Sequence, residues 1–474
     1  MIFNSLAYLI FFPIVITCYF ILPFKLRWVW LLAASYYFYM SWNIDLIYLI
    51  LLTTLISYIC AILIERTADI RLKKIFLTTA LVSSLGVLFS FKYFNFLSRA
   101  LTGFINIFSV NMPEYALDLI LPIGISFYTF QTLSYVIDVY RGKVKAELHF
   151  GYYALFVSFF PQLVAGPIER PENLLPQLRA KHTPDALEFN EGLQIALRGF
   201  FKKLVVADLS AGYVNAVYNN PEEAVGLTVI IASLLFAVQI YGDFSGYTDI
   251  AVGCARMMGI RMTQNFNLPY SAKSIREFWS RWHISLSTWF RDYLYIPLGG
   301  NRCSVPRYLA NIFTVFVVSG LWHGAEWTFI IWGGLHGLYQ IAGHLTRNTR
   351  DKLYSLFRID KNGKAAGIWQ TFFTFMLVLF AWLFFRANNV QELGVLLNKL
   401  VFSWDISLSS LSSIGYGAVQ IAVTLLSVYI MRILDHTPRV LSSNRYILAV
   451  WTIAAAWLIL LTGDGAGEFI YFQF

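Results

Sequence analysis

The sequence predicts an all-α polytopic membrane protein, and three observations support this fold class. Of the 474 residues, 58% are hydrophobic and only 13% are charged, whereas soluble globular proteins carry about 25% charged residues. The mean hydropathy of the chain is +0.59, which one membrane anchor would not produce. Apolar runs of membrane-spanning length recur along the chain, separated by polar loops. We therefore expect one membrane domain, residues 1–474, with about ten transmembrane helices and additional re-entrant helices.

The first apolar run begins at Leu6 and ends near Pro23. It has no basic start, so we expect a retained span rather than a cleaved signal peptide. The following loops are alternately basic and acidic, which places the N-terminus outside and the basic loops in the cytoplasm. The other spans are expected between residues 27 and 45, near 46–64, from 75, before 140, and near 187–209, 225–241, 368–385, 418–432 and 446–461.

One apolar segment breaks this alternation. FGYYALFVSFFPQLVAGPIER lies between two basic loops, so both of its ends are predicted to be cytoplasmic. Pro161, Gly166 and Pro167 allow the chain to dip into the membrane and return on the same side. Irregular backbone at membrane depth is tolerated only inside protein or beside a water-filled cavity. The segment is therefore predicted to be re-entrant and to border a cavity.

A second interruption surrounds two histidines in VVSGLWHGAEWTFIIWGGLHG. The run from Tyr308 to Leu321 has 14 residues, about 21 Å of helix, which is shorter than the roughly 30 Å hydrocarbon core. The next run ends at another basic loop, so the two runs are expected to form a hairpin with its tip inside the membrane. His323 at this tip is the main catalytic candidate. An ionisable group there usually has a function, and burial favours the neutral imidazole that accepts a proton.

His336 follows thirteen residues after His323. On one unbroken helix this offset would place the two rings on nearly opposite faces, so His336 is interpreted as either a site-lining or a packing residue. Glu326 could orient His323, but its position also suits the acidic start of the next helix. The pattern is not HExxH and the four cysteines lack metal-ligand spacing, so we expect no metal ion.

The segment NFNLPYSAKSIREFWSRWHISLSTWFRDYLYIPLGGNR is both aromatic and basic. Its aromatic residues recur at three- and four-residue steps, which predicts one aromatic helix face at the cytoplasmic interface. His283 lies on a second stripe with arginines and serines. Interfacial anchoring would explain the tryptophans, but clustered arginines also fit the phosphates of a donor such as coenzyme A. The donor-binding candidates are Lys273, Arg276, Arg281, Trp282, Arg291 and Arg302.

Other charged residues receive simpler interpretations. The net charge of +9 lies in loops between apolar runs, as membrane insertion requires, so no nucleic-acid partner is expected. Arg198, Lys202 and Lys203 in RGFFKKLVVAD are interpreted as side chains that extend to lipid head groups. Asp243 and Asp249 lie among small residues and are interpreted as either packing or cavity-lining groups.

These motifs together resemble the membrane-bound O-acyltransferase superfamily, in the bacterial branch typified by the membrane subunit of alginate O-acetyltransferase. The resemblance runs almost end to end through ASYYFYMSW, LPIGISFYTFQTLSYVIDVYRG, FFPQLVAGPIER, FWSRWHISLSTWFRDYLYIPLGGNR, SGLWHGAEWTFIIWGGLHG, FAWLFFRA and FIYFQF. It implies helices around a central tunnel and a catalytic His323. It also implies that His283 lines the tunnel from the cytoplasmic side and that His336 matches a further position associated with activity.

The resemblance also implies a reaction. Such proteins commonly pass an acetyl group from acetyl-coenzyme A outward, either to an exported glycan or to an external partner of the SGNH-hydrolase type. The expected location is the inner (cytoplasmic) membrane of a bacterium, and no permanently bound cofactor is expected. D-alanyl transfer to teichoic acid and peptidoglycan O-acetylation stay open as related reactions. A proton-coupled transporter or flippase is the alternative from another class, but it predicts inverted repeats, which the sequence does not display.

Overall fold

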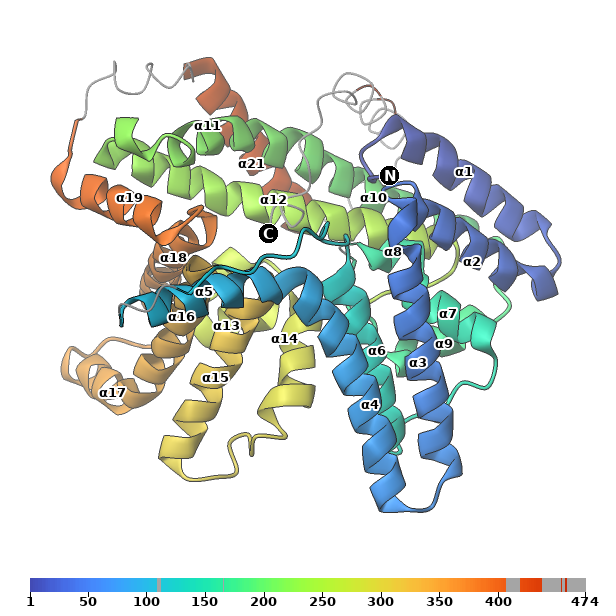
Figure 1. Cartoon of the computed structure of the whole chain (residues 1–474). Coiled ribbons are helices and arrows are strands. Elements are labelled where there is room, and N and C mark those ends of the chain that lie inside the picture. The colour runs from blue at the N-terminus through green and yellow to red at the C-terminus, as the bar shows by residue number, and fades with distance from the viewer. Residues whose placement is uncertain (109–111, 165, 406–417, 437–452, 454–456, 458–474) are drawn as a thin grey trace. The chain divides into compact units, whose positions relative to one another are not determined.

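The computed structural model describes residues 1–108, 112–164, 166–405, 418–436, 453 and 457 (Figure 1). All regular secondary structure in these ranges is helical. The α-helices are α1 (Leu6–Ile21), α2 (Phe24–Met40), α3 (Ile47–Arg66), α4 (Ile70–Leu88), α5 (Phe94–Asn106), α6 (Ile125–Tyr140), α7 (Phe150–Ser158), α8 (Phe160–Leu163), α9 (Pro171–Arg179), α10 (Ala186–Phe200), α11 (Asp208–Tyr218), α12 (Gly226–Met257), α13 (Ile275–Arg281), α14 (Ile284–Phe290), α15 (Val305–His323), α16 (Trp327–Leu345), α17 (Arg347–Leu356), α18 (Lys364–Arg386), α19 (Val390–Phe402) and α21 (Ala418–His436).

Several of these helices have the length and composition of membrane spans, so the predicted all-α polytopic membrane fold is confirmed. In the described part of the chain, 5 helical stretches are long and apolar enough to cross a bilayer. They are Ile44–Arg66, Ile70–Asn106, Gly226–Met257, Val305–His323 and Lys364–Arg386, and shorter apolar helices occur at Leu6–Ile21 and Val423–Ile433. Apart from residues 453 and 457, the span expected near 446–461 lies outside the described residues, as does the closing FIYFQF.

Two long helical stretches differ from the predicted spans. The chain from Ile70 to Asn106 stays helical, but a π-helical turn at Phe89–Tyr93 separates α4 from α5, and Figure 1 shows α5 leaving the axis of α4. The span expected at 225–241 was too short, because α12 continues to Met257. Its glycines do not end the helix. Gly246 packs so closely that an added Cβ would lie 2.7 Å from the Gly199 carbonyl oxygen.

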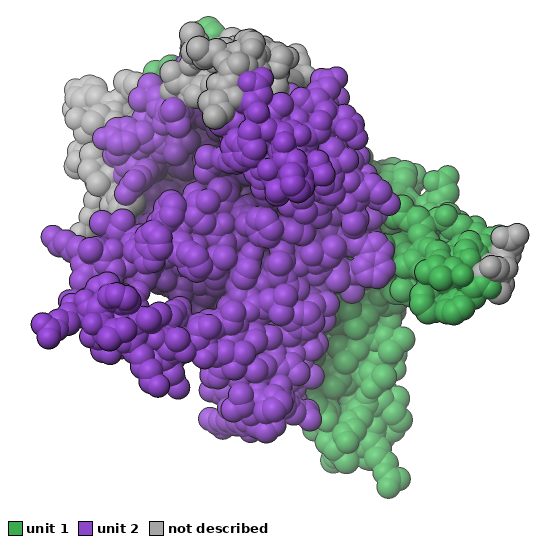
Figure 2. Space-filling view, turned by 90° about the vertical axis from the view of Figure 1, so that its left-hand side faces the viewer, with its two compact units in different colours: residues 1–197, 247–263, 451–464 green, residues 198–246, 264–450, 465–474 purple. Residues whose placement is uncertain are grey.

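The described residues divide into two compact units (Figure 2). Unit 1 contains Met1–Leu197, Tyr247–Thr263 and the described residues of Trp451–Asp464, and unit 2 contains Arg198–Gly246 and the described residues of Gln264–Val450. Helix α12 contributes its first part to unit 2 and its last part to unit 1. The assignment of residues 1–474 to a single membrane domain stays a prediction.

Unit 1 has the predicted interruption at its core. The segment expected to be re-entrant forms two short helices, α7 and α8, with a non-helical residue, Phe159, between them. Phe159 and Phe160 are fully buried, and α6 beside them is buried along almost its whole length. The predicted break in this segment is therefore confirmed, and it begins slightly before Pro161, which occupies the first turn of α8.

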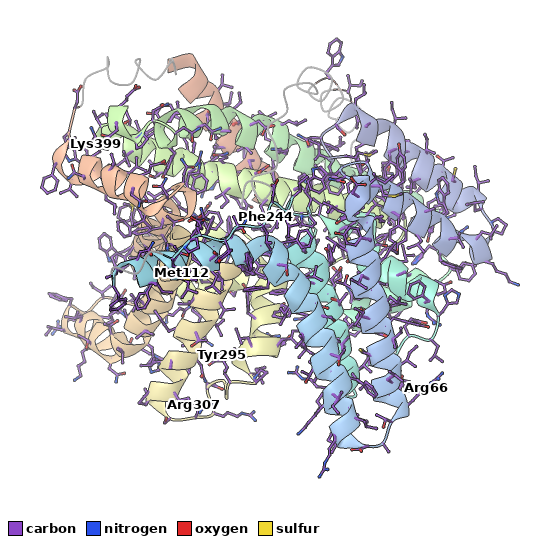
Figure 3. The ribbon with its side chains drawn as sticks, viewed as in Figure 1. Arg66, Met112, Phe244, Tyr295, Arg307 and Lys399 are labelled. Carbon is purple, nitrogen blue, oxygen red and sulfur yellow. The ribbon has the colours of Figure 1, made fainter. Side chains whose placement is uncertain are left out.

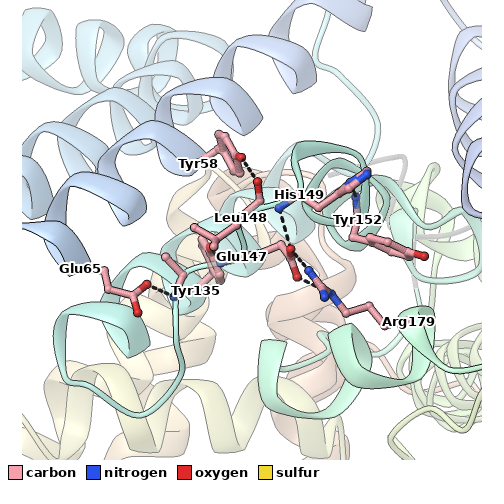
Figure 4. Close-up of polar contacts among 9 residues, drawn as sticks. Tyr58, Glu65, Tyr135, Glu147, Leu148, His149, Tyr152 and Arg179 are labelled. Atoms are coloured by element: carbon pink, nitrogen blue, oxygen red, sulfur yellow. Dashed lines mark hydrogen bonds and ion pairs between the residues drawn. The ribbon is translucent and has the colours of Figure 1, made fainter.

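A polar clamp fixes the basic loop that follows α6 (Figure 4). The Arg179 guanidinium on α9 donates to both oxygens of Glu147, whose carboxylate also accepts from the backbone N–H of His149 at 2.8 Å. The Glu147 backbone N–H donates to the Tyr135 hydroxyl at 2.7 Å. The buried carboxylate therefore has charged and neutral donors, which ties the loop to α6 and α9.

Unit 2 contains the predicted hairpin, α15 and α16, and two glycines bring its arms together. A Cβ atom at Gly320 would lie 2.2 Å from the carbonyl oxygen of Phe329, and one at Gly333 would lie 2.3 Å from that of Phe316. The expectation that the first arm is too short to span was wrong. Helix α15 has 19 residues, or about 28 Å, because Pro306 belongs to its first turn instead of to the preceding loop.

Candidate active site

His323 is the last residue of α15 and is 3% exposed. Aromatic rings surround its imidazole: the centroid of the Trp322 ring is 5.0 Å away, that of Trp332 is 5.1 Å away and that of Phe385 on α18 is 5.4 Å away. The chain turns sharply after it at Gly324, where an added Cβ would collide with the Phe329 ring. Helix α16 then begins, with Glu326 at its N-cap position.

His336 lies on α16, not on the same helix as His323, and is fully buried. Trp279 on α13 donates a hydrogen bond from Nε1 to Nδ1 of His336 at 3.2 Å. The Trp332 ring, one helical turn earlier on α16, lies 5.1 Å from the His336 ring and 5.1 Å from the His323 ring. The helical offset in the sequence suggested that the two histidines need not meet, but the hairpin brings both against one tryptophan.

His283 lies between α13 and α14 and is fully buried. Its ring is 4.6 Å from that of Phe244, a residue of α12 labelled in Figure 3, and 6.0 Å from that of Trp322. Burial lowers the pKa of His283 to about 3, so the ring is neutral at physiological pH. Trp322 contacts His283 and His323, so all three predicted histidines lie in one assembly. The name histidine cluster is used below for His283, His323 and His336 with Trp322 and Trp332.

The aromatic and basic segment is not the single helix that its spacing predicted. Helix α13 ends at Arg281 and α14 begins at Ile284, with His283 at φ 45°, a left-handed conformation that is strained for a residue with a side chain. Asn265 holds this turn: its backbone oxygen accepts from the N–H of Ile284 at 3.0 Å, and its side chain accepts from Ser285 at 3.1 Å. Hydrogen bonds to the loop that contains Asn265 thus override the helical periodicity.

The donor-binding candidates separate into two groups. Trp282 is 1% exposed and stacks on Phe278, so it belongs to the core. Arg281 and Arg291 are paired with the neighbouring acids Glu277 and Asp292 at 2.6 and 2.8 Å. The other three, Lys273, Arg276 and Arg302, have exposed side chains. A phosphate ligand would therefore meet three exposed cations and two that already carry a carboxylate.

A second buried polar assembly lies in unit 2, where the sequence suggested lipid-facing lysines. Lys202 and Lys203 are 4% and 1% exposed, so the prediction that they extend to head groups was wrong. Each ammonium is held by carboxylates instead, because a buried charge requires a partner. The name charge network is used below for these pairs: Lys202 with Asp435 at 2.7 Å, Lys203 with Asp243 at 2.8 Å and Asp208 at 2.9 Å, and Tyr241, whose hydroxyl donates to Asp435 at 2.8 Å.

The charge network also settles one open interpretation. Asp243 is 2% exposed and paired with Lys203, so it is a structural partner of a cation. Both lysines lie in the π-helical turn Phe201–Ala207, a local widening of the helix that is frequent at functional sites. Asp249 is half-buried on the part of α12 that belongs to unit 1.

Sequence reasoning missed two features of this region. Trp279 was assigned to an interfacial face, yet it donates to His336, and only the tertiary contact between α13 and α16 reveals this role. The pairing of Lys203 with Asp208 did have a signal, since an acid follows five residues later in an otherwise apolar run. Among the described residues, no group of three or more His, Cys, Asp or Glu side chains is placed to hold a metal ion, and the expected absence of a metal stays a prediction.

Comparison with known proteins identifies the family. Residues 143–387 match MBOAT, the membrane-bound O-acyltransferase family. A probable alginate O-acetylase of Azotobacter vinelandii is 38% identical over 91% of this chain and 84% of its own. The chain belongs to the membrane-bound O-acyltransferase family. It is therefore an integral-membrane O-acyltransferase, as the motifs implied.

Two further relatives indicate the range of this family. A peptidoglycan O-acetyltransferase of Helicobacter pylori is 33% identical over 94% of the chain and 91% of its own length. A teichoic acid D-alanyltransferase of Bacillus subtilis is 31% identical, but over only 46% of this acyltransferase and 57% of its own chain. The acetyltransferases thus share nearly the whole chain, whereas the D-alanyltransferase shares about half.

Proposed function

We propose that this acyltransferase transfers an acetyl group from acetyl-coenzyme A in the cytoplasm to a hydroxyl group on the outer side of the inner bacterial membrane. The acceptor is an exported polysaccharide, reached directly or through an external partner of the SGNH-hydrolase type. The N-terminus lies outside, and donor and acceptor meet in a tunnel at the histidine cluster. The observation that carries this proposal is the burial of three histidines in one aromatic assembly of a membrane O-acyltransferase.

His323 acts as the general base in this proposal. A neutral imidazole accepts the proton of the attacking hydroxyl as the hydroxyl oxygen bonds to the thioester carbonyl carbon. The same proton then passes to the departing thiolate, so a thiol and an ester are the products. The site thereby needs no permanently bound cofactor. General-base catalysis of this kind contributes about 10²–10⁴-fold.

His283 faces the donor side. It lies in the same segment as the donor-binding candidates Lys273, Arg276, Arg281, Arg291 and Arg302, and it contacts Trp322, which also contacts His323. The exposed cations bind the phosphates of coenzyme A, and the buried turn at His283 leads the acyl chain toward His323. Trp282 is buried behind this surface and supports its shape.

The names of the relatives indicate the chemical class of the acceptor. The names of the Azotobacter and Helicobacter relatives both specify O-acetylation of a polysaccharide, alginate in one and peptidoglycan in the other, and both proteins match over most of this chain. This coverage favours acetyl over D-alanyl transfer, since the D-alanyltransferase matches less than half of the chain. Peptidoglycan is the second candidate acceptor on the same ground.

Purified protein in proteoliposomes, supplied with radiolabelled acetyl-coenzyme A and with alginate or peptidoglycan fragments, tests the proposal. Wild type should label one glycan and release free thiol, and His323→Ala should lower the rate at least a hundredfold with unchanged thermal stability. His344→Ala, which changes an exposed histidine on the same hairpin, should retain full activity. Full activity in His323→Ala would overturn the assignment, and substrate flux without thiol release would indicate a transporter.

A further inference from the structure

The hydrogen bond between Trp279 and His336 determines where His336 carries its proton. An indole Nε1–H can only donate, and it points at His336 Nδ1 from 3.2 Å. The accepting Nδ1 therefore bears a lone pair and no proton. The imidazolium form has protons on both nitrogens, so a ring held in this way is neutral, with its single proton on Nε2.

The Nε2–H group of His336 is then a buried hydrogen-bond donor. His336 is fully buried, and its Nε2 has no hydrogen-bond partner among the residues that the structure describes. Buried polar atoms are nearly always hydrogen-bonded, so this open donor is available to an acceptor atom of a substrate or to a water molecule. The His336 and His323 rings each lie 5.1 Å from the Trp332 ring, so their centroids are separated by no more than twice that distance.

We propose that His336 Nε2–H donates a hydrogen bond to the carbonyl oxygen of the acyl group during transfer, and that Trp279 is the positioning residue that fixes this tautomer. The inference rests on the proposed function and deepens it. As the acceptor hydroxyl attacks, its proton passes to His323 and the carbonyl oxygen gains negative charge opposite His336 Nε2–H. Collapse of the tetrahedral intermediate expels the thiolate, which takes the proton from His323. A donor aimed at this oxyanion typically contributes 10²–10³-fold to kcat.

Two substitutions of His336 distinguish a donor from a base. The side-chain nitrogen of glutamine reaches about as far as Nε2 of histidine, whereas that of asparagine reaches about as far as Nδ1. The proposal therefore expects His336→Gln to keep at least tenfold more acetyl transfer than His336→Asn, with the loss in kcat and an unchanged KM. Neither amide can accept a proton as an imidazole does. Equal activity of the two variants, or higher activity of the asparagine variant, would overturn the donor role.

The role of Trp279 is tested by NMR spectroscopy and by kinetics. In protein labelled with ¹⁵N-histidine, the resonances absent from His336→Gln belong to His336, and they should show a bare Nδ1 and a protonated Nε2. Trp279→Phe should shift the Nδ1 resonance and lower kcat about tenfold. Trp382→Phe, which removes another buried indole that packs on Trp332 and Phe385, should leave the His336 resonances in place. A protonated Nδ1 in wild type would overturn the inference.

The experiments can refute the proposed function and the donor role of His336 independently. If wild type transfers no acetyl group, the proposed function fails whatever the resonances show. If wild type transfers acetyl and His323→Ala does not, but glutamine and asparagine at His336 are equivalent, only the donor role of His336 fails.

Discussion

The charge network and the histidine cluster are both buried in unit 2, but they treat polar groups in opposite ways. In the charge network each lysine Nζ lies 2.7–2.9 Å from a carboxylate oxygen, so opposite charges meet directly. In the histidine cluster the rings of His283 and His323 lie 4.6–6.0 Å from aromatic rings. The first assembly neutralises charge with charge, which stabilises the fold. In the second, burial lowers the pKa of His283 to about 3, so this ring is neutral and can accept or donate one proton.

Breaking the charge network should have the largest effect on stability. Lys203→Met leaves Asp208 and Asp243 facing one another without their shared cation, and stranding a buried charge typically costs about 3–5 kcal/mol. Thermal unfolding in detergent should show this loss. Lys361→Met is the matched control, because the Lys361–Asp351 pair is exposed and such pairs contribute about 0–1 kcal/mol. If both variants unfold at the wild-type temperature, the carboxylates do not depend on the buried lysine.

The histidine cluster depends instead on close helix packing, which two adjacent glycines can test. Gly333→Ala places a methyl group 2.3 Å from the Phe316 carbonyl oxygen, whereas a Cβ at Gly334 would be 3.8 Å from its nearest neighbour. Overpacking of this kind costs about 1–3 kcal/mol. Gly333→Ala should therefore lower both thermal stability and transfer activity, and Gly334→Ala should change neither. Equal behaviour of the two variants would mean that α15 and α16 do not need this contact.

These contrasts also show which features the sequence could predict. The first apolar helix, the break at α7 and α8 and the hairpin of α15 and α16 all follow from local patterns: apolar run length, Pro and Gly positions, and loop charge. Each of these patterns lies within a single segment of the chain. They were sufficient to select His323, whereas the family resemblance supplied the roles of His283 and His336, and the structure places all three in one cluster.

The errors arose where a distant segment decides the local structure. The turn at His283 exists because Asn265 binds the backbone of α14, and no spacing within α13 and α14 reveals that contact. Lys202 is buried because Asp435, more than two hundred residues away, pairs with it. Helix α12 continues beyond its predicted end, and backbone from a neighbouring helix packs closely against its glycines there. Propensity and charge position are weak guides when tertiary contacts override them.

The neutral ring of His283 has a smaller but specific consequence for the pH dependence of stability. His283 keeps a pKa of about 3 in the folded protein, because burial penalises the imidazolium, whereas an unfolded histidine has a pKa of about 6.5. Below about pH 6.5 the unfolded chain therefore binds a proton that the folded chain does not. The stability that the neutral ring contributes is present above pH 6.5 and is lost as the pH falls toward 3.

The loss from this one residue amounts to about 2 kcal/mol at pH 5. Thermal unfolding of wild type and of His283→Gln between pH 7 and pH 5 measures it, because glutamine cannot titrate. Wild type should lose about 2 kcal/mol more than the variant over this range, while the exposed control His344→Gln should follow wild type. Parallel pH profiles for wild type and His283→Gln would mean that His283 is solvated or charged in the folded protein. The cluster would then resemble the charge network, with a paired cation in place of a neutral ring.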